Sequence, residues 1–121
     1  MKLIDSNILI YSYKDAFKYL RPLILEADTF ISEITRLEVL GFHGLSKEED
    51  EYFTDLFLEM TVLEVDKPVL DEAIRMRKAY KMSLGDSILA ATALVHGLEV
   101  FTRNIVDFIK IPELKVVNPI L

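Results

Sequence analysis

The sequence predicts a single α/β domain with a mainly parallel central sheet flanked by helices. Two observations carry this prediction. Short apolar, strand-like segments alternate with helical patterns along all 121 residues, and no linker, internal repeat or low-complexity tract divides them. A chain of this length is the size of one domain, which we assign to residues 1–121. With 51% hydrophobic residues, it has enough apolar side chains for a core.

The first half of the chain is expected to contain two strands, each followed by helical sequence. Proline disrupts a helix interior, so Pro22 must lie in a first turn or at a kink. Ser32 can cap the helix that follows the second strand. The expected elements are a strand at residues 2–4, a helix or loop at 8–13, a mostly helical stretch at 15–27, a strand at 29–32 and a helix to about residue 40.

The second half carries clearer helix signals. Ser46 and Glu49 form a capping box, Asp66 can cap a helix with Pro68 in its first turn, and Gly97 can end the last long helix. The expected elements are a helix from residue 47 to about 60, a strand at 61–65, a helix at 67–80, a connector at 81–83, a helix up to Gly97, a strand at 99–102, a turn or short helix at 104–110 and a strand at 115–117.

Composition excludes several classes of protein. The net charge of −6 argues against a protein that coats a nucleic-acid duplex, so any contact with nucleic acid must be local. There is no cysteine, which excludes disulfides and thiolate zinc sites and suits a reducing cytoplasm. No signal peptide is visible, and no apolar run reaches the ~18 residues of a membrane helix. We therefore expect a cytoplasmic protein without a membrane segment.

Three acids occupy apolar surroundings. Asp5 interrupts an apolar run, Glu38 lies on the apolar side of a helical pattern, and Asp86 opens the most apolar helix. Burial of an unpaired carboxylate is costly, so each needs a compensating partner. A hard divalent cation, which prefers oxygen ligands, could serve all three. Parallel sheets place ligands at the carboxyl ends of strands, where these acids fall, and Asn104 and Asp107 follow the 99–102 strand.

Four segments resemble the motifs of PIN domains, in the order in which that family has them. Together they span essentially the whole chain, and the third and fourth are the most specific. They are Leu3–Ile10 (LIDSNILI), Ile34–Val39 (ITRLEV), Leu84–Ala93 (LGDSILAATA) and Phe101–Phe108 (FTRNIVDF).

The resemblance implies a magnesium- or manganese-dependent endoribonuclease. The size of the chain is similar to that of VapC-like toxins of type II toxin–antitoxin modules, which implies an RNA substrate, an antitoxin partner and a homodimer. By the same resemblance the metal-binding and catalytic acids are Asp5, Glu38, Asp86 and Asp107, with Asn104 as a neutral helper to the metal and Ser6, Asn7 and Thr102 in support.

The implied chemistry is consistent with this residue set. A divalent ion would screen the charge of a phosphodiester, orient it and acidify a water molecule. Glu38 could then accept a proton. No Ser–His–Asp set is evident, and this hydrolysis needs none.

Simpler roles stand beside these assignments. His43 and His96 lie near helix ends, where capping is more usual than catalysis. The stretch 52–57 is more typical of core than of an RNA platform. For the acids, the alternatives are a helix cap for Asp86, a turn role for Asp5, an ion pair with Arg36 or Arg75 for Glu38, and a helix-start or turn role for Asp107. Two basic groups could guide RNA phosphates or simply be solvated: Lys14, Lys18 and Arg21, and Lys78, Lys81 and Arg103.

Two further functions remain open at this stage. The chain could be an RNA-processing PIN nuclease that is not paired with an antitoxin. It could also be a PIN fold that has lost catalysis and only binds a partner, although the presence of Asp5, Glu38, Asp86 and Asp107 argues against that. Dinucleotide and P-loop fingerprints are absent.

Overall fold

The computed structural model describes all 121 residues and contains one five-stranded sheet. The strand order is β3-β2-β1-β4-β5, and every neighbouring pair is parallel. The predicted α/β class is therefore confirmed, with a sheet that is wholly rather than mainly parallel. The strands are β1 (Lys2–Ile4), β2 (Thr29–Ser32), β3 (Thr61–Leu63), β4 (Glu99–Phe101) and β5 (Val116–Val117).

Seven α-helices and one 3₁₀ turn connect the strands. The helix expected near residue 8 begins at Ser6, because Asp5 caps it. The stretch 15–27 divides into a 3₁₀ turn and a short helix, with Pro22 in the first turn of that helix. The helices are α1 (Ser6–Tyr13), α2 (Leu20–Ile24), α3 (Glu33–Leu40), α4 (Lys47–Glu59), α5 (Lys67–Ala79), α6 (Leu84–His96) and α7 (Ile105–Phe108), and the 3₁₀ turn η1 covers Asp15–Phe17.

The predicted helix caps are confirmed where the sequence was most specific. The Ser32 hydroxyl accepts a hydrogen bond from Ile34 N–H, and Ser46 and Glu49 form both bonds of a capping box. Gly97 caps α6 with φ at +67°, a left-handed conformation that glycine adopts readily. His96 lies in the last turn of α6, whereas His43 lies beyond the end of α3.

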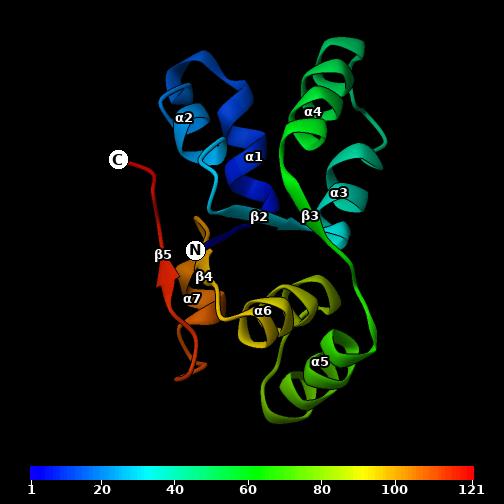
Figure 1. Cartoon of the computed structure of the whole chain (residues 1–121), viewed down its shortest axis with the longest axis vertical. Coiled ribbons are helices and arrows are strands. Elements are labelled where there is room, and N and C mark those ends of the chain that lie inside the picture. Colours follow the sequence, from blue (N-terminus) through cyan, green and yellow to red (C-terminus); the bar gives the residue numbers. More distant parts are fainter.

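The handedness of the connections decides which helices cover which face. The chain moves from β1 through β2 to β3 in one direction and then crosses to β4 and β5 in the other. Since parallel crossovers are right-handed, a reversal of direction sends later helices to the opposite face. Figure 1 shows α1 to α4 on one side of the sheet and α5, α6 and α7 on the other.

Alternating strand side chains give each face its own core. Ile4 and Ile31 point into one apolar cluster with α1 to α4, while Leu3 and Val100 point into another with α5, α6 and α7. Phe53, Leu56 and Phe57 are buried in the first cluster, which confirms that the apolar stripe of the stretch 52–57 is core. No helix is both long and apolar enough to cross a membrane.

Candidate functional site

The candidate site lies where the sheet reverses its order. The chain leaves β1 on one face and leaves β4, its neighbour, on the other face, and the carboxyl ends of two such strands are where α/β sheets place their ligands. The register pairs Ile4 with Phe101, and the residues that follow these two, Asp5 and Thr102, therefore meet.

Asp5 is buried and densely hydrogen-bonded. Its side chain is part of a residue only 8% exposed. Oδ1 accepts from Ser6 N–H at 2.7 Å and more weakly from the Ser6 hydroxyl at 3.4 Å. Oδ2 accepts from the Thr102 hydroxyl at 2.8 Å and from Asn7 Nδ2 at 3.2 Å. Burial raises the pKa of Asp5, and these hydrogen bonds oppose the rise.

Asn7 and Thr102 tie the first and fourth motifs together. Asn7 Nδ2 also donates to Thr102 Oγ1 at 3.3 Å, and Asn7 Oδ1 accepts from Arg103 N–H at 3.1 Å. Thr102 Oγ1 in turn accepts from Asn104 N–H at 3.0 Å. The two loops after β1 and β4 are thus one network around the carboxylate of Asp5.

Glu38 has no cationic partner. The expected alternatives were wrong: Arg36 pairs with Glu33 and Arg75 pairs with Glu72, in each case one turn away on the same helix. The residue as a whole is exposed, but its carboxyl group lies against the start of α6, where a Cβ on Gly85 would come within 3.1 Å of Oε2. Partial burial of the carboxyl group raises the pKa of Glu38, and the charges of Asp5 and Asp86 raise it further.

Asp86 stands in the first turn of α6. The cap itself is made by Ser83, whose hydroxyl accepts from Asp86 N–H at 3.1 Å; the carboxylate of Asp86 forms no hydrogen bond to Ser83 N–H. Partial burial is the largest cause that raises the pKa of Asp86. Repulsion from Asp5 and then from Asp107 raises it further, and Lys110 opposes the rise. The acid lines a cleft of about 460 Å³ that Asp107 and Lys110 share.

Asp107 and Asn104 take different positions. Asp107, on α7, is exposed and close enough to Asp86 to affect its pKa. Asn104 is the residue before α7, makes no side-chain hydrogen bond there and does not line the cleft with Asp86. Asp107 is thus the member of the fourth motif that faces Asp86.

Burial and, after it, mutual repulsion raise the pKa of the acids of the site. Asp5, Glu38 and Asp86 interact through their charges, Asp107 extends the group through Asp86, and Lys110 is the cation that acts on it. No three His, Asp or Glu side chains lie close enough together to form a ready-made metal cage. The donor set nonetheless suits Mg²⁺, which keeps several waters and takes only one or two carboxylates from a protein.

Two residues near the acids were not singled out by the sequence patterns. Gly85 allows the close approach of Glu38 to α6, and its place beside Asp86 in the third motif was the available signal. Lys110 lies three residues after Asp107 and therefore on the same side of a helical turn, and its ammonium donates to the Lys81 carbonyl at 2.6 Å.

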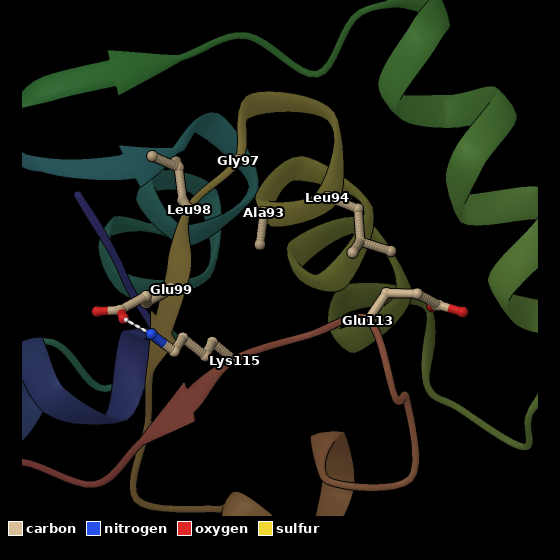
Figure 2. Close-up of a pocket in the computed structure, with 7 residues that line it drawn as sticks. All are labelled: Ala93, Leu94, Gly97, Leu98, Glu99, Glu113 and Lys115. Carbon is tan, nitrogen blue, oxygen red and sulfur yellow. Dashed lines mark ion pairs between the residues drawn. The ribbon is translucent and has the colours of Figure 1, made fainter.

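A second pocket lies at the amino ends of the strands, opposite the candidate site. Figure 2 shows this pocket of about 290 Å³, which residues just before β4 and β5 line. Glu99 and Lys115 form an ion pair of 3.2 Å there, and the Glu113 side chain points away from them. In a parallel sheet all carboxyl ends of the strands lie on the side opposite their amino ends. This pocket is therefore separate from the candidate site.

The comparisons agree with this architecture. The model of the PIN domain matches residues 2–114. The chain belongs to the PIN domain family.

Several solved structures have a similar fold, and one of them is a toxin–antitoxin complex. This PIN domain is 32% identical to a chain in a toxin–antitoxin complex from Klebsiella pneumoniae, with 99% of this chain and 98% of that chain covered and a TM-score of 0.80. It is 26% identical to a chain in FitAcB from Neisseria gonorrhoeae, with 98% of each chain covered and a TM-score of 0.76. It shares the fold of a chain in VapBC2 from Rickettsia felis bound to a promoter DNA fragment, at 21% identity, 97% coverage of both chains and a TM-score of 0.77. Comparison with curated proteins found no significant match.

Proposed function

We propose that this PIN domain is a metal-dependent endoribonuclease and the toxin of a VapBC-type toxin–antitoxin module. PIN domains are generally nucleases, which gives the proposal its reaction class. The observation that carries it is the convergence of Asp5, Glu38 and Asp86 at the switch point of the sheet, where burial and then their mutual repulsion raise the pKa of the last two. A bound cation would relieve this repulsion, and Mg²⁺ or Mn²⁺ suits oxygen donors.

Each residue has a role that follows from its contacts. Bound among the carboxylates, Mg²⁺ or Mn²⁺ would supply the positive charge that a phosphodiester transition state requires. Asp5, fixed by Ser6, Asn7 and Thr102, provides a rigid anionic anchor. Glu38 has a raised pKa and a partly exposed carboxyl group, which suits a group that accepts a proton from the attacking water. Asp86 and Asp107, which line one cleft together, complete the ligand set.

The antitoxin part of the proposal rests on the relatives and on one surface feature. A chain that is 32% identical to this one occurs in a toxin–antitoxin complex. Beside Glu38 lies an apolar cleft of about 190 Å³, lined by Ile10, Val39, Phe42, Leu45 and Phe53 and flanked by Glu49. An antitoxin segment with an apolar side chain and a neighbouring cation would match this cleft and would also cover Glu38.

A cytoplasmic homodimer completes the proposal. The absence of cysteine suits a reducing compartment. Helix α5 exposes two apolar side chains one turn apart, Leu70 and Ile74, and a homodimer interface that includes them would remove this apolar surface from water.

The decisive experiment is incubation of the purified protein with structured RNAs, in Mg²⁺, in Mn²⁺ and in excess chelator, followed by mapping of the product ends. We expect cleavage only with Mg²⁺ or Mn²⁺, with 5′-phosphate and 3′-hydroxyl ends, because attack by water leaves the 3′-oxygen as leaving group. Ca²⁺ should replace them poorly, since its looser coordination positions ligands less strictly.

Asp55→Asn, at an exposed position of α4, is the control for substitution of a site acid. This variant should cleave RNA as the wild type does. Products with 2′,3′-cyclic phosphates, or undiminished cleavage in chelator, would refute the proposed chemistry. Inspection of the neighbouring genes and co-expression with any small upstream gene would test the antitoxin part: absence of such a gene, or failure to form a complex, favours an unpaired RNA-processing nuclease.

A further inference from the structure

Two cations converge on one tyrosine beside the candidate site. The Lys14 ammonium lies 5.0 Å from the centroid of the Tyr11 ring, and the Arg103 guanidinium lies 5.2 Å from the same centroid. Lys14 follows the end of α1, whereas Arg103 lies in the loop between β4 and α7, so only the fold brings them together. Phe17 packs edge-on against Tyr11 with ring centroids 4.8 Å apart, which restricts the movement of the ring.

The main chain places this pair next to the acids. Arg103 N–H donates to Asn7 Oδ1 at 3.1 Å, and Asn7 Nδ2 donates to Asp5 Oδ2 at 3.2 Å. The residue before Arg103 is Thr102, which donates directly to Asp5. The backbone of Arg103 is therefore two hydrogen bonds away from the central carboxylate of the site.

Both cations keep their charge available. Lys14 and Arg103 are exposed, and neither forms an ion pair. Contact with an aromatic face leaves the N–H donors of a cation free to bind oxygen. Elsewhere in this acidic chain, five basic side chains are each paired with a carboxylate: Lys2, Arg36, Lys67, Arg75 and Lys115.

Arg21 shows what a structural cation looks like in the same region. Its Nε donates to the Ser12 carbonyl at 2.8 Å, its Nη2 donates to the Tyr13 carbonyl at 2.9 Å, and its guanidinium covers Tyr52 at 5.2 Å. These bonds hold the end of α1 in place. Within the predicted basic group of Lys14, Lys18 and Arg21, Arg21 therefore has a structural role.

We propose that Lys14 and Arg103 bind phosphates of a single-stranded RNA next to the bond that is cut, with Tyr11 positioning both side chains. The inference rests on the proposed ribonuclease function and adds the residues that hold its substrate. Basic side chains bind phosphate oxygens, and Arg binds them in a directional way. A net charge of −6 repels RNA from most of the surface, so a local cationic pair provides the approach.

The test measures RNA binding without cleavage. In an Asp86→Asn background, with chelator present, the anisotropy of a labelled 12-nucleotide single-stranded RNA is followed between 50 and 200 mM salt. Arg103→Gln and Lys14→Gln should each weaken binding about threefold and reduce the slope of log K against log salt by about 0.7, as expected for one lost phosphate contact. Arg103→Lys should restore the slope because it keeps the charge. The control Arg77→Gln, an exposed and unpaired cation on α5, should change neither quantity.

The active protein provides a second readout. In Mg²⁺, Arg103→Gln should raise the KM for RNA and leave kcat nearly unchanged, because the contact is made equally in the ground state and the transition state. If the wild type cleaves RNA but Arg103→Gln and Arg77→Gln have the same KM and the same salt slope, this inference is overturned and the proposed function is not. A wild type that neither cuts nor binds RNA would overturn the proposed function with it.

Discussion

Asp5 and Asp86 are held by different contacts, so the same substitution should affect them differently. Asp5 accepts hydrogen bonds from Ser6, Asn7 and Thr102, and an amide in its place would turn a donor towards those donors. Asp86 faces other acids and accepts no main-chain bond from its cap. Asp86→Asn is therefore the cleaner test of charge, because it removes an anion and leaves the local hydrogen bonds intact.

We predict that Asp86→Asn reduces RNA cleavage at least about 100-fold, the usual loss when one electrostatic group at a reacting centre is removed. The metal-free variant should melt slightly above the wild type, since burial and then repulsion from other acids raise the pKa of Asp86, and a neutral amide removes both costs. After allowance for solvent screening, the free energy of unfolding should increase by at most about 1 kcal/mol. Cleavage assays and thermal melts in chelator measure the two effects. Full activity of Asp86→Asn would contradict the proposed site.

Thr102 is the residue on which the site network depends most. It is fully buried, its hydroxyl donates to Asp5, and its oxygen accepts from Asn104 N–H. Thr102→Val should cost about 1–3 kcal/mol of unfolding free energy, because it leaves these buried groups unpaired, and it should also reduce cleavage. Thr102→Ser keeps the hydroxyl and is the control. Denaturant unfolding compares them; equal stability of the Val and Ser variants would show that the hydroxyl does not matter.

At the scale of elements, the approach of α3 to α6 controls where Glu38 lies. The Glu38 carboxylate closely approaches the position that a Gly85 Cβ would take. Gly85 has an ordinary negative φ, so its role is close approach and not backbone freedom. Gly97 is the opposite case, with φ at +67° and no atom within 4 Å of where its Cβ would stand.

We therefore predict a contrast between two alanine substitutions. Gly85→Ala should displace Glu38 and reduce cleavage about 10- to 100-fold, as small misplacements of catalytic groups do, while changing stability by less than about 1 kcal/mol. Gly97→Ala should lower the free energy of unfolding by about 1 kcal/mol, because alanine is disfavoured in the left-handed conformation, and it should keep its activity. Melting and cleavage assays on both proteins decide; unchanged cleavage in Gly85→Ala would mean that the position of Glu38 is not critical.

At the scale of the whole molecule, the acids make stability depend on pH and metal. Burial and repulsion raise the folded-state pKa of Asp5, Glu38 and Asp86 above the ordinary value of the unfolded chain. Groups of this kind favour folding fully below the unfolded pKa of about 4, and that contribution is lost as the pH rises through the folded pKa. Asp28 has the opposite behaviour, since its hydrogen bond with Lys2 lowers its pKa, but it contributes equally to any pair of site variants.

We predict that the Tm advantage of Asp86→Asn over the wild type shrinks as the pH falls towards about 4 and is complete near pH 7. At pH 7, millimolar Mg²⁺ should raise the Tm of the wild type and leave that of Asp86→Asn nearly unchanged, because a ligand of the folded state stabilises by mass action. Thermal melts across pH with and without Mg²⁺ measure both. A wild-type Tm that does not respond to Mg²⁺ would contradict metal binding.

The apolar surface of α5 leads to a prediction about assembly. Leu70 is 43% exposed and Ile74 is 54% exposed, and both should be covered in a homodimer. Light scattering at micromolar concentration should give a dimer for the wild type and a monomer for the double variant Leu70→Asp with Ile74→Asp. Leu58→Asp, at another exposed position, should remain dimeric. A monomeric wild type would contradict the prediction.

Most helix boundaries and the α/β class could be predicted from local sequence patterns. Helix starts at Ser32, Ser46 and Asp66 and the end at Gly97 follow from side chains within three or four residues of the backbone groups they satisfy. The least accurate expectation was the stretch 15–27, where a weak helical pattern with Pro22 gave a 3₁₀ turn and a five-residue helix. Such local competition has no strong sequence signal.

The assembly of the site could not be predicted from local patterns, because it depends on contacts between distant segments. Asp5 and Thr102 are 97 residues apart and meet because β1 and β4 pair in register. The same pairing brings Arg103 to Tyr11, and the approach of α6 to α7 makes Asp107, and not Asn104, the neighbour of Asp86. Local patterns report which residues satisfy the backbone nearby, whereas contacts across the sheet depend on strand order and crossover handedness, which are properties of the whole chain.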